Sequence, residues 1–327
     1  MISVKNLKWI LDVRLNKNSR IYVAGHEGLA GSAILRSLKK KGFLNLIIRT
    51  RSELDLKDAK SVFSHFNETK PEIVIIAAAK VGGIAANMAE PTEFLLDNLK
   101  IQNNLMEACL VYKVQKTLFL GSSCIYPRES LQPMKEEYFM HGPVEPTNES
   151  YAIAKIAGIR LAQAMNRQYG LNIISPMPCN LYGPGDHFEF ERSHVISALV
   201  RRFAEAKQAG AKSVTLWGTG SARREFLHVD DCAEACVFLL ENYDSPEIIN
   251  VGSGIDFTIK ELAELIAILV DYKGRIIWDT SKPDGMPRKL LDVTRLSALG
   301  WKHSIDLETG LKMVLEDFYK WQDSNKC

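Results

Sequence analysis

The sequence lacks a long apolar run, a strong net charge and closely paired cysteines. No apolar stretch in its 327 residues approaches the roughly 18 to 20 residues that a membrane helix needs. Residues 1–20 are amphipathic, but they have neither the apolar core nor the small-residue cleavage site of a signal peptide. A net charge of +2 gives no indication of a nucleic-acid partner. We therefore expect a cytoplasmic protein that binds neither membrane nor nucleic acid.

Cysteine is also sparse, and its spacing excludes two kinds of site. The six cysteines show no Cys-x-x-Cys pair and no paired histidines beside them. Zinc sites and disulfide frameworks depend on such spacing, so we predict no metal site and no disulfide framework. We expect most of them to be small core residues: Cys109, Cys124, Cys179, Cys232, Cys236 and Cys327.

The sequence does have a regular alternation of short apolar runs and helical patterns. The runs that predict strands lie at 20–24, 46–49, 73–76, 117–120 and 172–175. This alternation is typical of an α/β fold with a doubly wound parallel sheet. The rhythm changes after Tyr182, where the pattern predicts a helix at 194–208 and a strand at 213–217. We expect an extension at 1–18, a first domain at 19–181 plus about 225–252, and a smaller α/β substrate domain at about 182–224 plus 253–327.

A glycine-rich loop follows the first predicted strand. Gly25, Gly28 and Gly31 lie between that strand and the next helical pattern. Glycines at this spacing permit a tight turn, close approach of a pyrophosphate to the backbone, and close packing of helix on strand. A structural turn is the plainer explanation of a bare glycine pattern, but the place between strand and helix favours a dinucleotide at the helix N-terminus. The predicted contacts are Gly25, His26, Glu27, Gly28, Leu29, Ala30 and Gly31.

Tyr151 and Lys155 are one helical turn apart on a predicted helix that ends near Tyr169. A lysine ammonium at this spacing is expected to lower the pKa of a tyrosine from about 10, so that the phenol exchanges a proton with a sugar oxygen near neutral pH. A serine after the strand at 117–120 would orient the same oxygen, and Ser122 and Ser123 are both available. A lone Tyr-x-x-x-Lys pair also arises by chance on surface helices. Together with the glycine loop, it indicates a hydride-transfer site.

Longer motifs carry a resemblance to a known family. With the two motifs above, they resemble extended short-chain dehydrogenases/reductases that act on nucleotide sugars, and more narrowly the GDP-L-fucose synthase family. The resemblance runs from about 19 to 322 and implies a Rossmann domain that binds NADP. The motifs are Ala77-Ala78-Ala79-Lys80-Val81-Gly82-Gly83-Ile84, Gly121-Ser122-Ser123-Cys124-Ile125-Tyr126-Pro127, Glu145-Pro146-Thr147-Asn148, Asn180-Leu181-Tyr182-Gly183-Pro184, Ser193-His194-Val195, 224–231 and 282–289.

The family resemblance implies a reaction and a set of partners. GDP-4-keto-6-deoxy-D-mannose would be epimerised at C3 and C5, and then reduced at C4 by NADPH. A homodimer would pair the helices at 91–112 and 150–169 across a twofold axis, although their apolar residues are equally suited to packing on their own sheet.

The resemblance also implies catalytic roles. Epimerisation beside a ketone needs a base and an acid on opposite faces of the sugar, and a thiol and an imidazole can both work near neutral pH. Cys124 and His194 are the implied pair, although a buried cysteine and a structural histidine at a helix start are the plainer interpretations of each alone. Ser122 is the serine that matches the family motif. The implied catalytic set is Ser122, Cys124, Tyr151, Lys155 and His194.

Two binding sets follow from the same resemblance. Arg224 ranks first for the substrate diphosphate, because a guanidinium binds phosphate oxygens in pairs. The substrate set is Arg202, Trp217, Arg224, Asp284 and Lys289. The cofactor set adds Arg51, Ser52, Glu53, Leu54, Asp55, Leu56, Leu120, Gly121, Ser122, Ser123, Lys155, Pro178, Cys179, Asn180, Leu181 and His194 to the glycine loop.

Some positions depart from the family pattern. The second predicted strand has no acid at its end for a ribose hydroxyl, so Arg51 favours NADP. Glu27 stands where the family commonly has an arginine facing the 2′-phosphate, which leaves the strictness of NADPH over NADH open. Cys179 replaces a threonine, and Arg192 replaces a small polar residue near His194.

Two other functions fit part of these observations. A 4-reductase or 4-epimerase acting on a related GDP-sugar would keep the glycine loop, Tyr151 and Lys155, but would not need Cys124 together with His194. A non-catalytic NADP-binding regulator would need neither the tyrosine nor the lysine. The presence of all four residues favours the epimerase and reductase.

Overall fold

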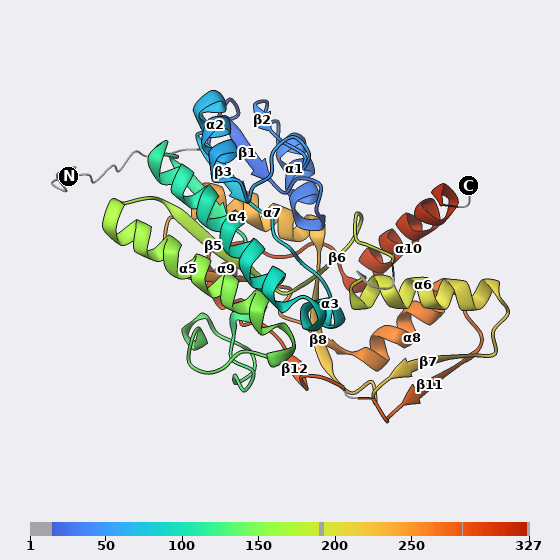
Figure 1. Cartoon of the computed structure of the whole chain (residues 1–327). Helices are drawn as coiled ribbons and strands as arrows, with labels where there is room; N and C mark the ends of the chain where they lie inside the picture. The colour runs from blue at the N-terminus through green and yellow to red at the C-terminus, as the bar shows by residue number, and fades with distance from the viewer. Residues whose placement is uncertain (1–14, 190–192, 283, 326–327) are drawn as a thin grey trace.

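The computed structural model describes residues 15–189, 193–282 and 284–325. Residues 1–14 of the predicted extension, Arg192 and Cys327 lie outside this range. The described chain forms a larger part around a parallel sheet and a smaller part made of short strands and helices, as Figure 1 shows.

The larger sheet has six strands, all parallel, in the order β2-β1-β3-β4-β5-β9. Its central strands β1 and β3 are apolar along their whole length and buried, as a parallel sheet with helices on both faces requires. The prediction of a doubly wound parallel sheet is confirmed. The strands are β1 (Ile21–Ala24), β2 (Leu46–Ile47), β3 (Ile73–Ile76), β4 (Lys116–Phe119), β5 (Ile173–Pro178) and β9 (Ile248–Val251).

Helices cover both faces of this sheet. α4 packs against α5 and α2, whereas α1 packs against α7. A right-handed crossover puts its helix on the other face of the sheet when the chain runs in the reverse direction from strand to strand. α1 therefore lies on the face of the sheet opposite to α2, α4 and α5 (Figure 1). The reversal falls between β1 and β3, where doubly wound sheets open a ligand crevice. The helices are α1 (Leu29–Lys40), α2 (Ala59–Thr69), α4 (Pro91–Val111), α5 (Glu149–Tyr169) and α7 (Val229–Asn242).

The smaller part has its own hydrophobic cluster, which includes Tyr182, Phe203 and Phe318. The helix predicted at 194–208 is α6, and the strand predicted at 213–217 is β7. The helices around the cluster are α6 (Val195–Gln208), α8 (Ile259–Val270) and α10 (Leu307–Ser324). The strands are β6 (Asn180–Tyr182), β8 (Arg223–His228), β10 (Asp256–Thr258) and β12 (Arg288–Lys289) in a four-stranded sheet, and β7 (Ser213–Trp217) with β11 (Arg275–Asp279) in a parallel pair.

Strand β8 joins the two parts. Its Phe226 belongs to the smaller cluster, whereas the next residue, Leu227, belongs to the core of the larger part. The described chain also has short elements that the sequence patterns did not predict. They are α3 (Ile84–Ala89), α9 (Thr294–Ala298) and the 3-10 turns η1 (Ser123–Ile125), η2 (Glu136–Tyr138) and η3 (Pro146–Asn148).

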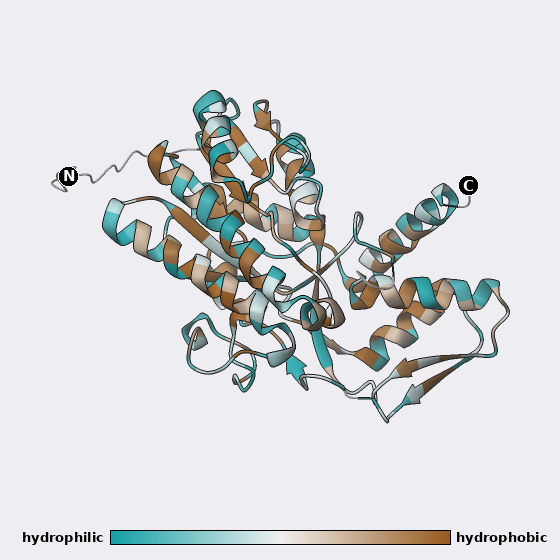
Figure 2. Ribbon diagram, in the orientation of Figure 1, coloured by the Kyte–Doolittle hydropathy of each residue, from teal (hydrophilic) through white to brown (hydrophobic). Residues whose placement is uncertain are grey.

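Hydropathy follows this architecture. Figure 2 shows the hydrophobic colour along the strands of the larger sheet, while the surrounding helices alternate between hydrophobic and hydrophilic residues. None of the helices among the described residues is long and apolar enough to cross a bilayer.

Candidate active site

Lys155 lies at the centre of the candidate site. It projects from α5 and is 3% exposed. Its Nζ donates a hydrogen bond to the carbonyl oxygen of Leu120, just after β4, at 2.7 Å. Burial lowers the pKa of Lys155 to about 8. The helix thus brings an ammonium to the carboxyl end of the sheet, where it titrates close to neutral pH.

Tyr151 lies one turn before it, with its ring centroid 5.9 Å from the Lys155 ammonium. We expected Lys155 to lower the pKa of this phenol. In the structure the pKa is raised well above its ordinary value instead, because burial and then the charge of Cys124 outweigh a hydrogen bond with Ser122. The expectation considered only the helical spacing, whereas the interior position of the phenol determines the direction. Of the two candidate serines, Ser122 is the one that bonds to Tyr151, while Ser123 is buried at 4% exposure.

Cys124 lies in the turn η1, directly after Ser122. Its Sγ accepts hydrogen bonds from Asn148 Nδ2 at 3.1 Å and from Lys289 Nζ at 3.4 Å. Lys289 was expected to hold the substrate diphosphate, and here it also contacts the thiol. A cation beside a sulfur favours the thiolate, which is the reactive form. Asn148 was not predicted as a site residue, although it ends the motif at 145–148.

His194 is the residue before α6, in the smaller part. Its Nδ1 lies 2.8 Å from Oδ1 of Asp186, and its side chain is 40% exposed. The hydrogen bond to Asp186 raises the pKa of His194 from its ordinary value of 6.5, and burial only partly opposes it. Asp186 was not predicted as a site residue. The only signal was its position directly after a Gly-Pro-Gly turn, eight residues before the histidine.

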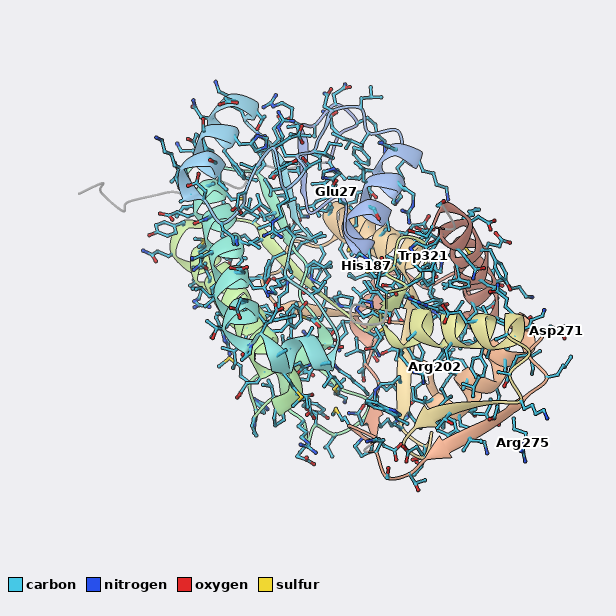
Figure 3. The ribbon with its side chains drawn as sticks, turned by 45° about the vertical axis from the view of Figure 1, so that its right-hand side comes forward. Glu27, His187, Arg202, Asp271, Arg275 and Trp321 are labelled. Carbon is cyan, nitrogen blue, oxygen red and sulfur yellow. The ribbon has the colours of Figure 1, made fainter. Side chains whose placement is uncertain are left out.

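The glycine loop packs closely on the sheet. A Cβ on Gly25, whose φ is +87°, would lie 2.6 Å from Cα of Ala78. A Cβ on Gly31 would overlap the carbonyl oxygen of Gly25 and lie 2.7 Å from its carbonyl carbon. Gly28 is the residue before α1. No side chain caps the first amide groups of this helix, and its first turn has no acidic residue. The N-terminus of α1 is therefore free to bind a phosphate. The rest of the predicted loop, His26, Glu27, Leu29 and Ala30, is only partly buried or exposed, with Glu27 visible beside the start of α1 in Figure 3.

The segment after β2 lies beside this loop. Glu53 accepts hydrogen bonds from the backbone and side chain of Thr50, at 2.7 and 2.9 Å. These bonds lower the pKa of Glu53, and the charges of Arg49 and His26 add to the effect. Arg51 is exposed and has no ion-pair partner among the residues described. The other predicted contacts of this segment are Ser52, Leu54, Asp55 and Leu56, of which Leu54 and Leu56 pack on the core.

The ends of β4 and β5 complete this edge of the sheet. The amide of Gly121 donates to the carbonyl of Pro176 at 2.9 Å, and a Cβ on Gly121 would overlap Met177. Pro178 ends β5, Cys179 links the two strands, and Asn180 and Leu181 lie on β6. Burial raises the pKa of Cys179 well above its ordinary value, so this thiol is a packing residue of the described structure.

The predicted substrate residues gather in the smaller part. Lys289 and Arg224 are register partners on β12 and β8. Both oxygens of Asp284 bind Thr219, two residues after Trp217, which is 69% exposed. Arg202, labelled in Figure 3 on α6, donates to the carbonyl of Thr215 at 3.0 Å on the same strand as Trp217. Cations and an exposed aromatic ring thus lie on neighbouring elements.

Known proteins are similar to this chain over nearly its whole length. GDP-L-fucose synthase 1 of Arabidopsis thaliana is 52% identical over 312 residues, covering 95% of each chain. GDP-L-fucose synthase of Escherichia coli is 51% identical over 313 residues, covering 93% of this chain and 98% of that protein. The crystal structure of a GDP-L-fucose synthetase from Naegleria fowleri bound to NADP is 27% identical, with a TM-score of 0.87 over 96% of this chain and 98% of that one. Residues 21–252 match the model of the NAD dependent epimerase/dehydratase family. The chain belongs to that family, within the extended short-chain dehydrogenases/reductases.

Proposed function

We propose that this chain is a GDP-L-fucose synthase that uses NADPH. It takes a GDP-sugar, specifically GDP-4-keto-6-deoxy-D-mannose, inverts C3 and C5, and reduces the C4 ketone. Relatives of this name that are more than half identical over nearly the whole chain support the assignment. So does the arrangement of the candidate site.

One observation carries the assignment furthest. The Cys124 thiol is held by Lys289 and Asn148, close enough to the Tyr151 phenol for its charge to raise the pKa of that phenol. A reductase without epimerase activity needs the phenol and the buried lysine but has no use for a thiol at the reacting sugar. The pairing therefore favours the bifunctional enzyme over a 4-reductase of a related GDP-sugar.

The epimerase step uses groups from both parts. Cys124, whose Sγ accepts a hydrogen bond from Lys289, is the base that removes a proton from the carbon beside the ketone. The hydrogen bond to Asp186 raises the pKa of His194, which favours the protonated ring and suits it to be the acid that returns a proton to the opposite face. Ser122 and Tyr151 bind the C4 oxygen, on which negative charge develops between the two transfers.

The reductase step uses residues of the larger part alone. The residues of the glycine loop and the open N-terminus of α1 fit the pyrophosphate of NADPH, which when bound supplies the hydride to C4. Tyr151 donates its proton to the C4 oxygen. Its raised pKa keeps the phenol protonated and ready to act as an acid. The cation of Lys155 stabilises the phenolate that results and binds the nicotinamide ribose.

The division of labour between the parts belongs to the same proposal. The larger part would hold the cofactor, and the smaller part the GDP group, with Arg224, Lys289 and Trp217 as contacts. We also propose a homodimer through α4 and α5, on which Leu96, Val111, Ile153 and Tyr169 are 41–55% exposed. The cysteines among the described residues are free, as is usual in a reducing compartment, which supports a cytoplasmic location.

Turnover of the keto sugar with NADPH in deuterated water tests the function. NMR of the wild-type product should show GDP-L-fucose with deuterium at C3 and C5. The Tyr151→Phe variant should lose reduction by about 10²-fold or more while exchange at C3 and C5 continues. Cys124→Ser is the matched control, because it should lose exchange and release a product that is reduced without inversion. Exchange and reduction that fall together in both variants would contradict the assigned roles, and a wild-type enzyme that leaves the keto sugar unchanged would contradict the function.

A further inference from the structure

The turn after β6 carries a buried acid whose position was not evident from the sequence. Asp186 has no exposed side-chain surface. Its Oδ1 faces Nδ1 of His194 at 2.8 Å and accepts the backbone amide of His187 at 2.9 Å. Its Oδ2 accepts the hydroxyl of Ser197, also buried, at 2.6 Å. Both carboxylate oxygens are therefore used.

The contacts of Asp186 keep its carboxylate facing His194. A buried carboxylate is costly unless a cation or several hydrogen bonds compensate it. Among the described residues His194 is the only group in contact with Asp186 that can carry a positive charge. Ser197 and the amide of His187 hold the carboxylate from the other sides, so Asp186 cannot turn away from the histidine.

We propose that Asp186 is a positioning residue that binds Nδ1–H of His194 and so leaves Nε2 as the nitrogen that delivers a proton to the sugar. This rests on the proposed function. Hydrogen bonding of one ring nitrogen fixes the tautomer and the orientation of an imidazole. The raised pKa of His194 agrees with this arrangement.

The proton balance is complete without a further reagent. Cys124 thiolate takes the proton from the carbon beside the ketone and becomes a thiol, and the electron pair of that C–H bond moves onto the C4 oxygen. The enolate carbon then takes the Nε2 proton from its opposite face as the ketone re-forms, and His194 becomes neutral. Water restores both groups before the second carbon is inverted.

The test compares Asp186→Asn with a control on α10 that contacts the same turn. Asp317 Oδ2 accepts the amide of Gly185 at 3.2 Å, so Asp317→Asn loosens the turn without changing the acid that faces His194. Asp186→Asn should slow C3 and C5 exchange by about 10²-fold with little change in KM, and should shift the product toward the sugar reduced without inversion. Asp317→Asn should retain wild-type exchange. A loss of exchange as large in Asp317→Asn would overturn the proposal.

A double variant separates positioning from simple damage to the fold. In a His194→Ala background, Asp186→Asn should slow exchange no further, because the acid acts only through the histidine. A further tenfold loss would overturn the proposal. NADPH consumption should persist in each variant, since reduction uses Tyr151.

A spectroscopic measurement on the wild-type protein does not depend on turnover. The imidazole resonances of His194, assigned with His194→Ala, should show Nδ1 protonated and a titration midpoint above 6.5. A midpoint at or below 6.5 would overturn the role of Asp186 even in an active enzyme. A wild-type enzyme that shows this titration but neither exchanges nor reduces the keto sugar would instead overturn the proposed function, and the role of Asp186 with it.

Discussion

The third glycine of the cofactor loop offers a sharp test of the close packing between α1 and β1. A Cβ on Gly31 would overlap backbone atoms of Gly25, which cannot rotate out of the way as a side chain would. Overpacking typically costs about 1–3 kcal/mol, and we expect the upper end of that range here. Alanine also favours a helix over glycine by up to about 1 kcal/mol. The net destabilisation of Gly31→Ala should therefore be about 2 kcal/mol. With about 2.1 cal/mol/K of unfolding entropy per residue, this lowers the melting temperature by about 3 °C.

Gly28→Ala is the matched control in the same loop. Its Cβ would lie 3.5 Å from the carbonyl oxygen of Gly25, an ordinary contact, at a φ of −77° that alanine adopts freely. Calorimetry without cofactor should therefore show a wild-type melting temperature. Titration calorimetry should show weaker NADPH binding, because this is the glycine at which the pyrophosphate approaches the backbone. A Gly31→Ala protein that melts at or above the wild-type temperature would refute the packing argument.

Three further predictions concern charged groups of the site. Burial lowers the pKa of Lys155 to about 8, whereas the lysine of the unfolded chain has a pKa of about 10.5. Between these two pH values the unfolded chain binds more protons than the folded one, so the stability of the fold rises with pH from about 8 to 10.5. Lys155→Met should therefore be more stable than wild type by roughly 2 kcal/mol at pH 7 in urea unfolding, with the advantage shrinking by pH 10; a constant advantage would contradict this. Lys289→Met should slow exchange at C3 and C5 by about 10²-fold, and should also slow alkylation of Cys124 at pH 7. An unchanged rate of alkylation would show that the ammonium of Lys289 does not favour the thiolate. Glu27→Arg should raise the ratio of kcat/KM for NADPH over NADH by up to about tenfold, and Arg51→Ala should lower this ratio. An unchanged ratio in Arg51→Ala would mean that the 2′-phosphate binds elsewhere.

The features that the sequence predicted well are those set by nearby residues. Tyr151 and Lys155 share a helix, so their spacing alone places them together. The glycine loop lies between a strand and the helix that follows it, and its geometry depends on a few residues. The alternation of apolar strands and helices was enough to predict a doubly wound parallel sheet, although not the order of its strands.

The features that it did not predict depend on distant contacts. Lys289 reaches Cys124 across 165 positions of the chain. Asp186 meets His194 through a turn whose conformation no periodic pattern describes. The pKa of Tyr151 moves opposite to the expectation, because burial is a property of the packed structure and is not visible in helical spacing.

Hydrogen bonds at the junction of the two parts hold the strand that carries Lys289, the residue that contacts the proposed base Cys124. The carboxylate of Glu225 on β8 accepts the amides of Gly254 and Leu291 at 2.7 and 2.9 Å, and the amide of Met134 binds the carbonyl of Leu290 at 2.7 Å. The bonds to Leu290 and Leu291 hold the chain directly after β12, the strand that ends with Lys289.

The acid, the base and the phenol of the proposed reaction are therefore held by three different elements. His194 depends on the start of α6, Cys124 on the η1 turn and its contact with β12, and Tyr151 on α5. This separation is the physical reason why exchange and reduction should be lost in different variants of one enzyme, although both steps occur on the same sugar.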